Sequence, residues 1–177
     1  MPYVLRPTKI DEKMKTVEKD ILGKVDEEID QKLEQFKRRK NLVIYRLTEN
    51  PEKDTKERQK YDEILIKQII SELELEDLKF KTMRIGKLIT NKIRPIKIEL
   101  EEESDKFKIL TRAKNIRKTQ IAKFKRIIIT TDMTFKEREI NKILREELKA
   151  RRDAGEKNLK IKDGKIVPSV QGGDGGE

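Results

Sequence analysis

Residues 94–100, with the sequence RPIKIEL, decide the fold predicted for this chain. Ile96, Ile98 and Leu100 alternate with charged residues in this stretch. Alternation of period two is typical of a β-strand that buries one face and leaves the other in water. The stretch therefore predicts a half-buried strand, which needs neighbouring strands and a covering layer on its apolar face.

Three further strands and two helices are predicted around this strand. A helical apolar face runs from about 55 to 74, and a second helix is predicted to begin at Ser104, as N-cap behind three consecutive glutamates. That second helix is expected to bury Phe107, Leu110 and Ala113. The three strands are NLVIYRLT at 41–48, ended by Glu49-Asn50-Pro51, then FKTMRIGK at 80–87 and RIIITT at 126–131.

The order of these elements is β-α-β-β-α-β over residues 41–132. This order is the split βαβ arrangement of ferredoxin-like and RNA-recognition domains. The predicted fold class is therefore α+β.

A long helix is predicted before this domain, in residues 1–40. The segment from about 8 to 40 holds one glycine and no proline. Its apolar residues recur about every 3.7 residues, close to the eleven-residue repeat of a nearly straight coiled coil. A narrow stripe predicts self-association through residues 10–36, and the alternative is a helix that packs back on its own domain. The stripe is Ile10, Met14, Val17, Ile21, Val25, Ile29, Leu33 and Phe36.

A small unit is predicted after the domain, in residues 133–169. Thr134 and Glu137 have the spacing of a capping box, which predicts that a helix opens here. Residues 159–167 then predict a hairpin that turns on Asp163-Gly164. The glycine-rich segment 170–177 is expected to be disordered.

Composition narrows the classes of function. Of 177 residues, 34% are hydrophobic and 44% are charged, and no apolar run is long enough to cross a membrane. Neither a leader peptide nor a membrane partner is expected. The absence of cysteine and histidine removes zinc sites of the finger or deaminase type and the commonest general base. We therefore expect no metal, no cofactor and no catalysis, with a carboxylate-dependent nuclease or transposase as the enzymatic alternative.

Positive charge is concentrated in residues 106–126. This stretch has nine Lys or Arg residues in twenty-one positions and no acid, against a net charge of +10 for the chain. Dense charge of one sign on a folded element is typical of a surface that binds a polyanion, whereas a merely soluble face mixes both signs. The alternatives are a solvated helix and an adaptor that binds an acidic protein.

Six segments in this order resemble the first-open-reading-frame protein of LINE-type, non-LTR retrotransposons, the family labelled "transposase 22". The resemblance covers about residues 35–168. The segments are RRKNLVIYRLTE (38–49), RIGK (84–87), RPIKIEL (94–100), KILTRAKNIR (108–117), DMTFKERE (132–139) and ELKARRDAGEKNLKIKDGKIV (147–167).

The resemblance implies a nucleic-acid chaperone that packages RNA. That family has a trimerising coiled coil, an atypical RNA-recognition domain and a small C-terminal domain. It implies a homotrimer bound to single-stranded RNA in cytoplasmic, and also nuclear, ribonucleoprotein particles. This chain departs from the mammalian members in its shorter coiled coil and smaller C-terminal unit. The residues that the resemblance implies contact phosphates are Arg38, Arg39, Arg84, Arg151 and Arg152.

The predicted binding mode is capture of the phosphate backbone, of RNA or of single-stranded DNA. Alternation puts Leu42 and Ile44 on one face of the first strand and Val43 and Tyr45 on the other; if the first face is the core, Tyr45 lies on the open one. Tyr45 could then stack a base, or be covered by another element. The remaining predicted binding residues are cations: Lys40, Lys87, Arg94, Lys97, Lys108, Arg112, Lys118, Lys123, Lys125 and Arg126.

Overall fold

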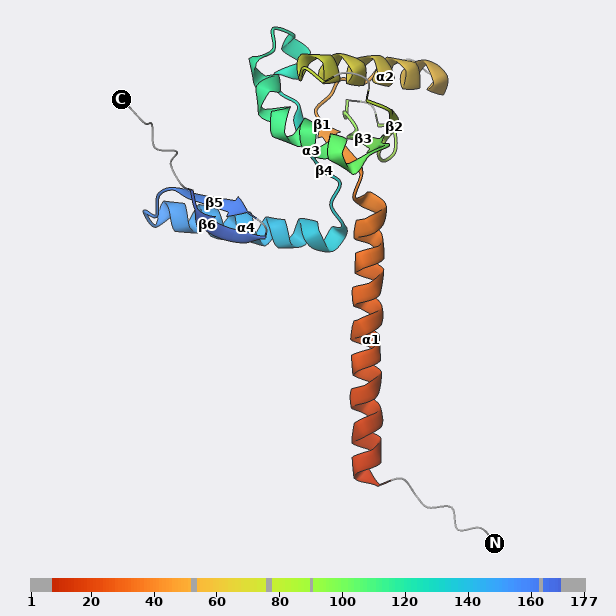
Figure 1. Cartoon of the computed structure of the whole chain (residues 1–177), viewed down its shortest axis with the longest axis vertical. Helices are drawn as coiled ribbons and strands as arrows, with labels where there is room; N and C mark the ends of the chain where they lie inside the picture. The colour runs from red at the N-terminus through yellow and green to blue at the C-terminus, as the bar shows by residue number, and fades with distance from the viewer. Residues whose placement is uncertain (1–7, 52–53, 76–77, 90, 163, 170–177) are drawn as a thin grey trace. The chain divides into compact units, whose positions relative to one another are not determined.

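The computed structural model describes residues 8–51, 54–75, 78–89, 91–162 and 164–169. The chain forms two compact units, Met1–Asp132 and Met133–Glu177, and each is described by itself. The described elements confirm the predicted α+β class (Figure 1). The predicted disorder of 170–177 and the predicted turn residue Asp163 lie outside the described residues.

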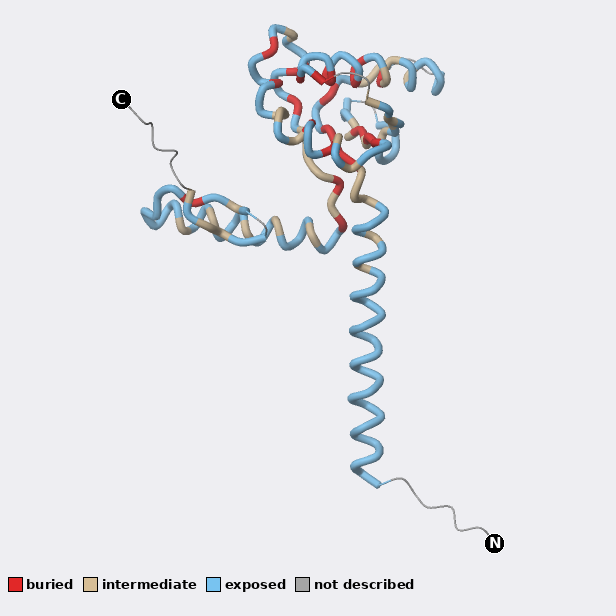
Figure 2. Tube along the Cα trace, viewed as in Figure 1, coloured by how far each residue is buried: buried red, intermediate tan, exposed pale blue. Residues whose placement is uncertain are grey.

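The first unit opens with helix α1, Lys9–Arg38, whose N-cap Thr8 accepts a hydrogen bond from the Asp11 amide. Asp11 in turn accepts from the Thr8 amide, which completes a capping box and fixes where the helix begins. No residue of α1 is buried, and Figure 2 shows it exposed along almost its whole length. Its apolar stripe is therefore uncovered within this unit.

The sheet of the first unit has the strand order β2-β3-β1-β4, and every pair is antiparallel. Its elements follow the predicted order β-α-β-β-α-β, and two 3₁₀ helices, η1 and η2, precede the last strand. The bounds are β1 Asn41–Tyr45, α2 Thr55–Glu72, β2 Phe80–Arg84, β3 Ile96–Leu100, α3 Glu103–Arg112, η1 Ala113–Lys118, η2 Ala122–Phe124 and β4 Ile128–Thr131.

One face of this sheet carries the core. Leu42 pairs with Ile98 and Ile44 with Ile96 across β1 and β3, so these side chains share a face. All four are buried, and they pack with apolar residues of both helices and both 3₁₀ turns in a single cluster. The face of β1 that carries Leu42 and Ile44 is therefore the core face. The cluster's helical and 3₁₀ members include Leu65, Ile66, Ile69, Ile109, Ile116 and Phe124.

Helix α3 presents a face to the core that only partly matches the predicted one, because Leu110 packs against the core cluster and Ala113 is half-buried. It begins at Glu103 with Glu102 as N-cap, so the prediction of Ser104 as N-cap is wrong. Phe107, predicted to be buried, is 57% exposed, while Ile109 and Lys106 are buried. The helix is rotated because Ile109 fits the core beside the 3₁₀ turns, and Lys106 reaches a backbone acceptor, the Arg39 carbonyl, at 2.6 Å.

The second unit consists of helix α4, Phe135–Asp153, and a hairpin of β5, Leu159–Lys162, with β6, Lys165–Pro168. Thr134 and Glu137 form the predicted capping box: the Glu137 amide donates to Thr134, and the Thr134 amide to Glu137. The structure therefore confirms the helix start and the hairpin of this unit.

Candidate nucleic-acid interface

Arg84 lies in the core of the first unit, although the resemblance implied a phosphate contact. Its side chain is 5% exposed, and it forms a two-pronged ion pair with Asp62 of α2, at 2.5 and 3.0 Å. Its remaining N–H groups donate to the carbonyls of Leu47, Thr48 and Arg94 at 2.7–2.9 Å. An arginine has five N–H donors, and all are used here. The implied phosphate contact is corrected: Arg84 is a structural residue.

Arg94 is also held inside the first unit rather than presented to solvent. It forms an ion pair with Glu49 and donates to the Gly86 carbonyl at 3.0 Å. The hydrogen bond to Glu49 raises the pKa of Arg94 against the effect of burial. Burial raises the pKa of Glu49, but hydrogen bonds from Arg94 outweigh it and hold that pKa below its ordinary value. The pair therefore stabilises the fold at neutral pH and loses this contribution on acidification.

The cations at the C-terminal end of α1 form ion pairs and hydrogen bonds within the first unit. Arg38 donates to Asp132 at 2.9 Å and to Glu34 at 2.6 Å. Burial lowers the pKa of Arg38, but attraction to Asp132 and the bond to Glu34 outweigh it, so the pKa is raised. Arg39 stacks on Phe36, with 3.5 Å from its guanidinium to the ring centre, and Lys40 donates to the Glu101 carbonyl. Arg38 thus ties the end of α1 to the residue after β4, while Arg39, which also lies 3.8 Å from Glu103, and Lys40 are half-buried and already have contacts within the unit.

The start of the acid-free stretch is likewise occupied by contacts within the unit. Lys106 is buried, Lys108 pairs with Asp105 at 2.7 Å, and Arg112 donates to the carbonyls of Leu73 and Glu74. The Arg112 bonds fasten the end of α3 to the end of α2, whereas Lys106 donates to the Arg39 carbonyl and Lys108 pairs within α3.

The later part of the stretch, residues 114–126, forms an exposed basic surface. This surface is formed by η1, η2 and the residues next to them. Ile116, Thr119 and Phe124 are buried there, while the neighbouring cations are exposed. Lys123 contacts the Gln68 side chain at 3.1 Å and lies over the Phe124 ring. We name this surface the basic segment; its exposed cations are Lys114, Arg117, Lys118, Lys123, Lys125 and Arg126. Lys114 and Arg117 were not among the predicted site residues, although the same acid-free run contains them.

The sheet face opposite the core is open to solvent in part. Tyr45 is 37% exposed, and it pairs with Ile128 of β4 in the ladder. Val43 lies on the same face and is buried, between Lys97 of β3 and Thr130 of β4. Lys97 is half-buried and Lys87 is exposed. Tyr45 is thus partly exposed on this face, next to the exposed Arg46 in the chain.

The two predicted arginines of the second unit form contacts within that unit. Arg151 pairs with Glu156 at 2.7 Å and with Glu147 at 3.8 Å. A hydrogen bond to Glu156 raises the pKa of Arg151. Arg152 donates to the Leu159 carbonyl at 2.6 Å, which ties α4 to the hairpin. Arg152 remains exposed and Arg151 half-exposed, so both could still contact a phosphate.

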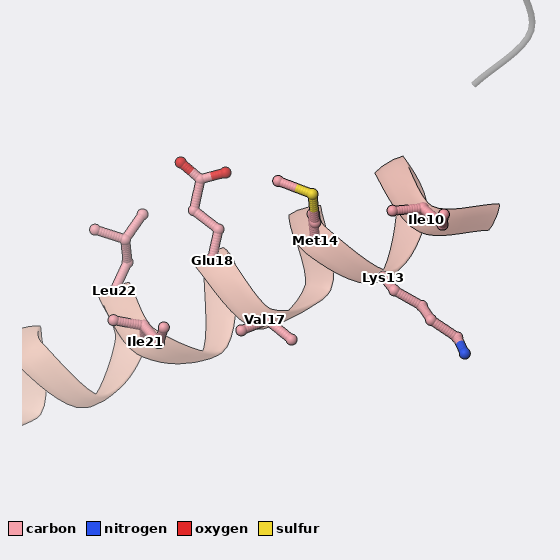
Figure 3. Close-up of a pocket in the computed structure, with 7 residues that line it drawn as sticks. All are labelled: Ile10, Lys13, Met14, Val17, Glu18, Ile21 and Leu22. Atoms are coloured by element: carbon pink, nitrogen blue, oxygen red, sulfur yellow. The ribbon is translucent and has the colours of Figure 1, made fainter. Parts of the chain in front are cut away.

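The apolar stripe of α1 is the other unoccupied surface. Figure 3 shows its N-terminal part, where an open hollow runs along the helix. Leu22, which the predicted stripe omitted, widens the apolar surface at this level and is 57% exposed. The hollow is lined by Ile10, Lys13, Met14, Val17, Glu18, Ile21 and Leu22.

The described part of the chain has neither a metal-binding cluster nor a membrane-spanning helix. It contains no group of three or more acidic side chains placed to hold a metal ion. None of its helices combines the length and apolar character needed to cross a membrane.

No protein-family model matches the chain, and no curated protein matches it.

Proposed function

We propose that the protein binds single-stranded nucleic acid, RNA in the first place, through the phosphate backbone. The observation that carries this proposal is the basic segment: six exposed cations on a folded surface within a stretch that has no acid. Phosphate contacts depend on charge and reach, which exposed lysines and arginines supply without a shaped pocket. Arg39, Lys40, Lys87 and Lys97 are the further cations able to join the same interface.

We further propose that copies of the chain associate through the stripe of α1. The joined basic segments would hold one strand with an avidity far above that of a single copy. Many weak and exchangeable contacts suit a chaperone, because strands can be held, aligned and released. The family resemblance supports a homotrimer in the ribonucleoprotein particle of a LINE-type retrotransposon, in the cytoplasm and also in the nucleus.

The salt dependence of binding tests the proposal. If the six cations of the basic segment each neutralise one phosphate, the logarithm of affinity for a single strand should fall against the logarithm of salt concentration with a slope of about −4 per protomer. Fluorescence anisotropy with a labelled oligouridine measures this slope. A slope near zero contradicts phosphate capture. A competition experiment tests the adaptor alternative. If an acidic protein stays bound to the chain when single-stranded RNA is added in excess, the adaptor alternative is favoured.

Replacing Lys123, Lys125 and Arg126 together with alanine is expected to weaken oligouridine binding about 100-fold at about 0.1 M salt, because three phosphate contacts are lost. The slope should become less negative by about 2. The matched control replaces three exposed lysines of α2, namely Lys56, Lys60 and Lys67. Equal losses in both variants would show that net charge, not the basic segment, governs binding; circular dichroism checks that both remain folded.

A further inference from the structure

The loop between β2 and β3 exposes aliphatic side chains, and the proposed phosphate contacts do not account for them. Leu88 is 54% exposed and Ile89 50%, with Ile85 and Ile93 similarly open on either side. The sequence around them, from Ile85 to Arg94, holds Lys87 and Lys92 and no acid. The loop thus combines an apolar projection with positive charge.

The base of this loop is held by hydrogen bonds to backbone carbonyls. The Ile85 amide donates to the Pro95 carbonyl at 2.8 Å, which extends the β2–β3 ladder by one step. Arg94 donates to the Gly86 carbonyl at 3.0 Å, and Arg84 to the Arg94 carbonyl at 2.7 Å. The Lys92 amide donates to the Ile89 carbonyl at 3.1 Å, which closes a turn. The anchored arginines therefore hold both ends of the loop, while Leu88 and Ile89 stay exposed to solvent.

The chemistry of the loop selects its occupant. Aliphatic side chains among lysines fit a partner that offers apolar faces with negative charge beside them. A step between two stacked bases has this character, since the flat bases are flanked by phosphates. Leucine and isoleucine are among the side chains that proteins insert between base steps, where they unstack the bases. Neighbouring lysines would attract the flanking phosphates and hold the aliphatic tip at the step.

We propose that Leu88 and Ile89 form an aliphatic wedge that enters between adjacent bases and unstacks them. This inference rests on the proposed function and assigns a strand-opening step to it. Lys87 and Lys92 hold the phosphates on either side of the opened step. Ile85 continues the open sheet face past Met83, so the wedge adjoins the face that carries Tyr45.

The test compares the full-length protein with the double variant Leu88→Ser/Ile89→Ser. The probe is an RNA duplex that carries 2-aminopurine beside a mismatch, whose fluorescence rises when the base is unstacked. The wild type should raise this fluorescence and speed strand exchange. The variant should lose at least tenfold in exchange rate, about 1.4 kcal/mol in barrier height, with less than threefold change in oligouridine affinity. The matched control is Ile64→Ser, an isoleucine of α2 that is 54% exposed.

Each outcome separates the wedge from the binding function. If the wild type does not bind oligouridine, the proposed function fails and the wedge with it. If it binds while 2-aminopurine fluorescence and strand exchange stay unchanged, only the wedge is wrong. A double variant that exchanges strands at the wild-type rate also overturns the wedge. The wedge is also wrong if the double variant loses strand-exchange rate and at the same time changes its mass in native mass spectrometry, because the loop would then join copies of the chain.

Discussion

Replacing Val25 with aspartate is expected to abolish self-association of the protein at micromolar concentration. Val25 lies at the middle of the α1 stripe, eleven residues from both Met14 and Phe36. All three side chains are exposed in the isolated chain, and none of the 30 residues of α1 is buried. A helix of this kind gains most of its stability from packing an apolar face, so a second copy is the expected cover.

The expected effect of Val25→Asp is large because every copy would place a carboxylate in the same layer of the seam. Burying an unpaired charge costs several kcal/mol, so association should weaken at least about 1000-fold. Native mass spectrometry and sedimentation report the assembly directly. The control is Glu27→Asp, since it places an aspartate on the opposite side of the helix. An unchanged mass for Val25→Asp would show that the copies do not associate through this stripe.

The Val25→Asp variant also distinguishes the avidity of joined copies from the phosphate contacts of a single copy. Since the basic segment is intact in Val25→Asp, a monomer should still bind a short oligonucleotide like one protomer. Its affinity for a long strand should fall by about 10²–10⁴, the advantage that linked sites give.

Replacing Asp62 with alanine is expected to lower the free energy of unfolding by about 3–5 kcal/mol, because the Arg84 charge would be left buried without its partner. The side chains of this pair are only 5% and 6% exposed, and they join α2 to β2. Arg84 would retain its three carbonyl acceptors, which satisfy N–H groups without neutralising the charge. Denaturation by urea, followed by circular dichroism, measures the change.

A surface ion pair of the same unit provides the comparison for Asp62. Lys79 pairs with Glu101 at 3.3 Å, and both side chains are mostly exposed. Exposed pairs contribute little, so Lys79→Ala should change the free energy of unfolding by less than about 1 kcal/mol. If Asp62→Ala were equally mild, the buried pair would not be a main support of the fold.

Local patterns predicted the helices and strands, although not the 3₁₀ helices η1 and η2 or the N-cap of α3. The alternation at 94–100 indicated β3, the stripe from Ile10 to Phe36 indicated α1, and Thr134 with Glu137 indicated where α4 begins. These signals depend on the repeat of a single element or on a cap, and both are set by neighbours in sequence. The order of elements then restricted the topology to few arrangements, and the ferredoxin-like one is present.

The interface could be predicted only as a region. The acid-free run from Lys106 to Arg126 indicated where positive charge gathers, but not which cations stay exposed. Arg84 has the same parity along β2 as Phe80 and Thr82, a signal that it faces the core. Nothing in the sequence near Arg84 indicated Asp62 as its partner.

Patterns within the sequence specified the helices and strands, their order, and the excess of positive charge with its location along the chain. Which of these charges stay exposed depended on tertiary contacts. Folding turned Arg84, Arg94 and Arg38 to buried or half-buried acids and left Lys125 and Arg126 in solvent. The physical reason is that periodicity and capping act between residues close in sequence. The pairing of a charge instead depends on which segments the folded sheet and its helices bring within a few ångströms.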